Sequence, residues 1–228
     1  MAVVFRFPFP AVLVGLALAV AVSVSVLVSV VRADPLPFTP DWREQSFPRL
    51  SANSYGALGN RLDIVSDQAV SVLYTALPES RWRARSASWR WGVEQSVPPT
   101  DLRRKGGDDR NISIYFVFMD EASARRAGPD PRLRSLLGNR NARMLVYVWG
   151  GDQPRGAVLD SPYLAARGKS LILRGAGTGA HPEAVDLAAD YARIFGGAPE
   201  ALVGIAVSAD SDDTKTAVRA WISEMVIR

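Results

Sequence analysis

The chain has 228 residues, of which 48% are hydrophobic and 22% are charged, a composition typical of a globular protein and not of a disordered one. Its formal net charge of +4 falls to +2 without the first 33 residues, which contain Arg6 and Arg32 and no acidic residue. So small an excess gives no reason to expect a nucleic-acid partner. The chain has no cysteine, which excludes disulfides and thiolate chemistry.

The N-terminal segment is apolar. Residues 11–31 are an unbroken run of Ala, Val, Leu, Ser and Gly, followed by Val31-Arg32-Ala33, which fits a signal-peptide cleavage site. The sequence therefore predicts a signal peptide over residues 1–33, with an uncleaved anchor as the alternative, because 21 residues are enough to span a bilayer. Either way, we expect export to the periplasm or cell envelope, with membrane contact only through this segment.

The remaining chain is predicted to hold one domain. Residues 34–45 contain three prolines and are predicted to form an extended leader. Residues 46–228 are long enough for a single domain with a sizeable core.

Two apolar runs, residues 86–94 and 112–119, organise this domain. In the second run Ile112, Ile114, Phe116 and Phe118 share one face, and the other face is also largely apolar, which predicts a central strand covered on both sides. In the first run Trp89, Trp91 and Val93 share a face, which indicates a half-buried strand. We expect the two strands to pair as a hairpin with a long charged loop.

Alternating patterns continue through the chain. Residues 143–149 predict another strand, as do the runs 62–65, 69–77, 170–174, 202–207 and 220–227. Pro129 and Pro131 divide a stretch that predicts one short helix on each side, and residues 183–195 have helical spacing. Strands outnumber helices, so the predicted fold is mainly β: an antiparallel β-sandwich or jelly roll with a few short helices.

No cofactor or metal is expected from the glycines or the histidine. Gly175-x-Gly177-x-x-Ala180 resembles a dinucleotide-binding turn but lacks the acidic residue that such a site needs. His181 is the only histidine, so a multi-histidine metal site is excluded, and its glycine-rich surroundings predict an exposed loop position.

Two acidic groups offer the more specific chemistry. Asp108 and Asp109 follow two glycines, and Asp210, Asp212 and Asp213 follow a predicted strand. The favoured interpretation is that they bond loop amides and neighbouring arginines such as Arg90 or Arg110. A cation site in the second group, or a carboxylate pair of the glycosidase type drawn from both groups, are the alternatives.

Aromatic residues can stack on sugars, although most at strand spacing belong to a core. With the acidic groups, they complete the set of candidate ligand-binding residues. The candidates are Trp89, Arg90, Trp91, Asp108, Asp109, Asp210 and Asp212. No catalytic residue is assigned.

Several segments, in order and spacing, resemble the bacterial domain-of-unknown-function family 3047 over roughly residues 47–228. They are Ser88-Trp89-Arg90-Trp91, Gly107-Asp108-Asp109, the strand 112–118, the run 145–149, Asp190-Tyr191, Phe195-Gly196, and the run 204–214 with its acidic group. The resemblance implies an exported protein whose fold looks like galactose-binding and carbohydrate-binding jelly rolls, and it implies no catalytic residues. One departure is Arg110-Asn111-Ile112, where the family tends to have Ala-Arg-Val.

Together these features predict a non-catalytic binding module for a glycan or another extended polar ligand, or an envelope component. A structural or interaction protein of the envelope is the first alternative. An enzyme acting on sugars is the second, and it requires two of the carboxylates about 5 to 10 Å apart in an open cleft.

Overall fold

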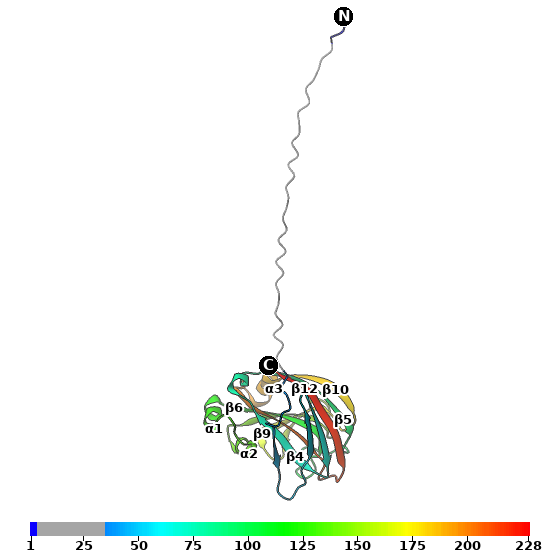
Figure 1. Ribbon diagram of the computed structural model, residues 1–228, viewed down its shortest axis with the longest axis vertical. Helices are drawn as coiled ribbons and strands as arrows, with labels where there is room; N and C mark the ends of the chain where they lie inside the picture. The colour runs from blue at the N-terminus through cyan, green and yellow to red at the C-terminus, as the bar shows by residue number, and fades with distance from the viewer. Residues whose placement is uncertain (4–34) are drawn as a thin grey trace. The chain divides into compact units, whose positions relative to one another are not determined.

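The computed structural model describes residues 1–3 and 35–228, and the predicted signal peptide lies almost wholly outside this part (Figure 1). No helix in the described part has the length and apolar character needed to cross a membrane. Phe38 and Trp42, from the stretch predicted as a leader, are buried in the core of the domain.

The domain is a sandwich of two sheets, as predicted. The larger sheet has seven strands in the order β1 (Arg43–Ser46), β4 (Val70–Ala76), β11 (Ala201–Asp210), β6 (Arg110–Met119), β7 (Arg143–Trp149), β9 (Ala165–Arg174) and β8 (Val158–Ser161). The smaller sheet has five, in the order β10 (Gly179–Asp186), β5 (Ser86–Gln95), β12 (Ala217–Ile227), β3 (Arg61–Asp67) and β2 (Ser54–Leu58).

Short helices complete the fold. They are α1 (Glu121–Ala127), α2 (Leu133–Gly138), α3 (Leu187–Phe195) and a 3₁₀ turn over Glu79–Arg81. The two helices predicted around Pro129 and Pro131 are therefore confirmed. Asp120 begins α1 by accepting a hydrogen bond of 2.8 Å from the backbone N–H of Ser123.

The main core lies between the sheets. Alternate residues of β6 (Ile112, Ile114, Phe116, Phe118) face alternate residues of β5 (Ala87, Trp89, Trp91, Val93) across it. The Trp89 ring lies 6.2 Å from that of Phe116 and 5.8 Å from that of Tyr147, measured between ring centroids. The predicted inward faces of both strands are thus confirmed.

A second apolar cluster covers the opposite, outer face of the larger sheet. Val117 of β6 and Val146 and Val148 of β7 belong to it, together with Leu133 and Leu136 of α2. β6 is the fourth of the seven strands and is buried on both faces, as its sequence predicted. Helices α1 and α2 lie beside the larger sheet (Figure 1).

The predicted hairpin of residues 86–94 and 112–119 is wrong. β5 pairs with β10 and β12 in the smaller sheet, whereas β6 pairs with β11 and β7 in the larger one. Each strand carries a large apolar face, and these faces bury each other only if the strands lie in opposite layers. Residues 96–109 therefore cross between the sheets, with Val97 in the main core and Leu102 in the outer cluster.

Three further details differ from expectation. β7 and β9 pair in parallel, so the larger sheet is not purely antiparallel. Residues 183–186 belong to β10, and α3 begins only after Asp186, whose side chain accepts a hydrogen bond of 2.9 Å from the Ala189 amide. Pairing of β10 along β5 takes precedence over helical propensity there. His181 lies in β10, half-buried, with its ring 5.3 Å from that of Trp149, and not in an exposed loop.

Candidate functional site

A pocket of about 340 Å³ opens on the outer face of the larger sheet. Most of its wall is aliphatic, because valines and a methionine of β4, β6 and β7 face outward there and leucines of α2 lie beside them. The wall includes Val72, Val117, Leu137, Met144, Val146 and Val148. The turn that joins β8 to β9 closes one side with Tyr163 and Leu164.

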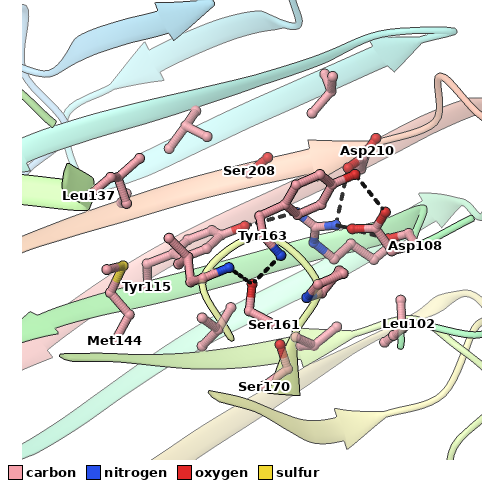
Figure 2. A pocket seen from close by; sticks show the side chains of 18 of the residues that line it. Leu102, Asp108, Tyr115, Leu137, Met144, Ser161, Tyr163, Ser170, Ser208 and Asp210 are labelled. Atoms are coloured by element: carbon pink, nitrogen blue, oxygen red, sulfur yellow. Dashed lines mark hydrogen bonds and ion pairs between the residues drawn. The ribbon is translucent and has the colours of Figure 1, made fainter. Parts of the chain in front are cut away.

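The pocket has two different ends. Figure 2 shows Leu137 and Met144 at one end and Asp108 and Asp210 at the other, with Tyr163 beside the acidic pair. An occupant of this cavity therefore meets aliphatic surface along most of its length and charged groups at a single end.

Arg110 organises the charged end. It is the first residue of β6 and lies opposite Asp210, the last residue of β11, in the strand pairing. Its Nη1 donates to Asp210 Oδ2 at 3.1 Å and to Asp108 Oδ2 at 3.2 Å, and its Nη2 donates to the Tyr115 hydroxyl at 2.8 Å. Only 12% of the Arg110 side chain is exposed, so these bonds replace most of its hydration.

Asp108 is also held from the other side. The Tyr163 hydroxyl donates to Asp108 Oδ1 at 3.0 Å, so both oxygens of this carboxylate accept hydrogen bonds. Tyr163 itself is 57% exposed. Burial of its hydroxyl raises the pKa of Tyr163, and the neighbouring Asp108 raises that pKa further. Tyr163 therefore lies over the charged end of the pocket and is held there by its hydrogen bond to Asp108.

Asp210 is the most perturbed carboxyl group of the site. Burial raises the pKa of Asp210 to about 9, although Arg110 opposes this effect, and a hydrogen bond with Asp212 raises the pKa further. The Oδ1 atom of Asp210 is buried and has no partner among the described residues. Asp210 therefore holds its proton more tightly than an exposed aspartate does.

Asp109 joins the two acidic groups. Its Oδ2 accepts from the Thr214 backbone N–H at 2.7 Å and from the Thr214 hydroxyl at 2.5 Å, and its Oδ1 accepts from the Asp213 N–H at 3.3 Å. These bonds match the interpretation in which the aspartates bond loop amides. They bring the loop after β11 against the segment that enters β6, so both acidic groups lie at one place.

The structure separates the candidate residues. Asp108, Asp210 and Asp212 line the pocket, and Asp109 holds the loop beside it. Trp89 and Trp91 do not reach the pocket: they are 2% and 0% exposed in the core between the sheets, where no ligand can touch them. Arg90 is exposed but lies on β5, in the other sheet. The ligand-binding role of the aspartates stays a prediction.

Sequence reasoning missed several lining residues. The sequence suggests Arg110 only as a charge partner, and its patterns do not mark Tyr115, Tyr163 or the valines of the outer face as site residues. The one available signal was the second apolar face of residues 112–119, which required a cover.

Fold and site together define a β-sandwich protein whose larger sheet carries an aliphatic pocket with charged groups at one end. The family model described as "Protein of unknown function (DUF3047)" matches residues 40–226, and the chain belongs to this family. A comparison with curated proteins found no match.

Two solved structures match this chain at low scores. The xyloglucanase domain of NopAA, a type three effector from Sinorhizobium fredii, in complex with cellobiose, has 12% identity and a TM-score of 0.44, covering 82% of this chain and 92% of that one. A loop swap mutant of Necallimastix patriciarum Xyn11A has 5% identity and a TM-score of 0.32, covering 82% and 99%. At these scores neither likeness bears on function.

Proposed function

We propose that the domain is a binding module for a small ligand with an apolar body and a polar head. The observation that carries the proposal is the pocket of about 340 Å³, with aliphatic walls and one charged end. Cavities of this size with a few convergent polar groups are the usual form of small-molecule sites.

The charges at the polar end indicate the chemistry of the head. Four aspartates and one arginine line the pocket, so negative groups outnumber positive ones even with Asp210 protonated. The guanidinium of Arg110 is already engaged by Asp108, Asp210 and Tyr115. An anionic head would meet repulsion, because Arg110 is the one cationic side chain among the described residues that line the pocket. The head is therefore a cation or a set of hydrogen-bond donors, such as an ammonium group or a polyol.

An unmodified glycan fits this pocket less well. Extended glycans stack on exposed aromatic rings, and Tyr163 is the ring that the pocket exposes most. Aliphatic walls give a hydroxyl-rich chain few partners. The polar ligand predicted from the sequence is thus better supported as the head group of a partly apolar molecule.

Calorimetric titration with matched probes tests the proposal. Octylammonium and octyl β-glucoside carry a donor head on the same chain, and octanoate carries an anionic one. We expect the first two to bind and octanoate to bind at least tenfold more weakly. Val146→Phe, which fills the cavity, should abolish binding, whereas Val65→Phe on the exposed face of β3 should not. The proposal would be overturned if all three probes bound equally well, or if the Val146→Phe variant bound them as the wild-type protein does.

A second candidate function is carboxylate-dependent hydrolysis of a glycoside. Asp108 Oδ2 and Asp210 Oδ2 both bond Arg110 Nη1, at 3.2 and 3.1 Å, so these oxygens lie no more than 6.3 Å apart. Retaining glycosidases separate their two carboxyl groups by about 5–5.5 Å. Asp210 is suited to act as the acid and Asp108 as the nucleophile.

A panel of nitrophenyl glycosides and oligosaccharides, incubated with the purified domain, tests this second function. The expected result is release of product that is lost in both Asp108→Asn and Asp210→Asn and retained in Asp63→Asn, a surface control on β3. If the protein binds octylammonium but turns over no substrate of the panel, the hydrolase function is refuted and the binding function remains.

We also propose that the domain works outside the cytoplasm, on the evidence of residues 1–33. Fusion of the full chain to alkaline phosphatase should give active enzyme, and deletion of residues 2–33 should remove that activity. Mass spectrometry of the exported protein distinguishes a mature N-terminus at Asp34 from a retained anchor.

A further inference from the structure

Three carboxyl groups gather beside the polar end of the pocket, where the loop after β11 meets the start of β6. One oxygen from each of Asp109, Asp212 and Asp213 lies within 4.8 Å of the others. Asp109 is buried, Asp212 is half-buried and Asp213 is exposed, so the group is open to solvent on the Asp213 side. Asp109 uses Oδ2 for its short bonds to Thr214, and its Oδ1 has only the 3.3 Å contact with the Asp213 amide.

A fourth carboxyl group, outside this set, points to a ligand there. Asp210 is 7% exposed, and its Oδ1 is buried without a partner among the described residues. The Asp210 side chain lies within hydrogen-bonding reach of Asp212. A buried oxygen without a donor is costly, and a second carboxyl group beside it supplies no positive charge. A cation placed between them would satisfy both.

We propose that Asp109, Asp212 and Asp213, with Asp210 Oδ1 as a fourth oxygen, form a Ca²⁺ site. Carboxylate oxygens are the ligands preferred by hard divalent cations. Ca²⁺ accepts six to eight oxygens at about 2.3–2.6 Å in flexible geometry, so it tolerates an irregular set of loop carboxylates better than Mg²⁺, which demands a near-ideal octahedron at about 2.0–2.1 Å. Water and loop carbonyls would complete the shell.

Such an ion would act on the pocket as well as on the fold. Asp212 and Asp213 line the pocket, so the cation would lie at its charged end. It would offset the excess of negative charge there and hold the loop over residues 211–214 against Asp109. Bound Ca²⁺ should therefore weaken octylammonium binding and relieve the repulsion of octanoate.

Calorimetric titration and thermal unfolding of EDTA-treated, dialysed protein at pH 7.5 test the site, with CaCl₂ and MgCl₂ as the probes. We expect Ca²⁺ to bind near one equivalent and to raise Tm by about 5–10 °C at a hundredfold excess over Kd. Mg²⁺ should give a clearly smaller shift. Asp212→Asn and Asp213→Asn should each raise the Kd for Ca²⁺ at least tenfold, whereas Asp63→Asn on β3 should leave this Kd unchanged.

Two results would overturn the proposal. If millimolar CaCl₂ gave neither binding heat nor a Tm shift with the wild-type protein, these carboxyl groups would not form a Ca²⁺ site. An equal response in Asp212→Asn and Asp213→Asn would place the bound ion elsewhere. The wild-type titration decides the matter even if the variants do not fold. It is also independent of the pocket ligand, because no organic probe is present.

Discussion

Arg110 and Asp210 face each other across the β6–β11 pair, and a hydrogen bond of 3.1 Å joins Arg110 Nη1 to Asp210 Oδ2. The same nitrogen bonds Asp108, which precedes β6. One buried guanidinium thus holds together two carboxyl groups that are about a hundred residues apart. The charged end of the pocket depends on this single side chain.

Replacement of Arg110 should be strongly destabilising. Arg110→Met leaves the Asp108 carboxylate buried without its cation and removes the donor to Asp210, and the expected loss is about 3–5 kcal/mol of unfolding free energy. Urea denaturation followed by tryptophan fluorescence measures it. Arg61→Met is the matched control, because that arginine pairs with Asp63 at the surface and should cost less than about 1 kcal/mol. Similar losses in both variants would mean that the buried network adds little.

Asp210 should make stability fall with rising pH. Its pKa is about 9 in the folded domain and 3.8 unfolded, so the folded form holds a proton that the unfolded form releases. The contribution of this proton to the free energy of unfolding is complete below about pH 4 and is lost as pH rises toward 9. Denaturation midpoints of wild type and Asp210→Asn between pH 5 and 8.5 check this, in EDTA. Asp210→Asn should have the flatter profile, and parallel profiles would refute the assignment.

Tyr163 should matter for binding and little for folding. The residue is 57% exposed, so Tyr163→Ala should change the free energy of unfolding by less than about 1 kcal/mol. The same change removes the ring that covers the charged end and should weaken octylammonium binding about tenfold. Tyr163→Phe keeps the ring and loses only the bond to Asp108, so its Kd should stay within about threefold of wild type. Indistinguishable titrations of Tyr163→Ala and wild type would show that the ring does not contact the ligand.

Gly92 should not tolerate a side chain. A Cβ atom at this position in β5 would lie 2.4 Å from the ring of Trp221, the residue of β12 that pairs with Gly92. Gly92→Ala should therefore lower stability by about 1–3 kcal/mol, seen as a lower Tm. Gly56→Ala on β2 is the control, because its Cβ would meet Asp63 at an ordinary 3.7 Å. A Tm for Gly92→Ala equal to that of the control would mean that Trp221 can move away freely.

The strand faces were predictable from sequence, whereas the layers were not. Alternation placed Ile112 and Val117 on opposite faces of one strand, and both faces are buried. Alternation says nothing about which strands pair, and it leaves a hairpin of residues 86–94 and 112–119 as the simplest prediction, although their apolar faces meet across the core. His181 and residues 183–186 were misplaced because β10 gains its order from pairing with β5, a contact that local composition does not reveal.

The site was predictable in part. Asp108, Asp109, Asp210 and Asp212 stood out because acidic residues after glycines or strands need partners. Their meeting point depends on β11 lying beside β6, a pairing between segments far apart in sequence. The aliphatic pocket depends on how incompletely α2 covers the outer face, which is a matter of three-dimensional packing. The chemistry of their rings alone makes Trp89 and Trp91 candidate ligand contacts, and burial between the sheets removes them from that set.

The position of β11 has a consequence for synthesis. It inserts between β4 and β6, both of which leave the ribosome long before residue 201. Until it arrives, two apolar strands keep unpaired edges, which is a recognised aggregation hazard. The nascent chain must therefore be kept apart from its copies until translation is nearly complete.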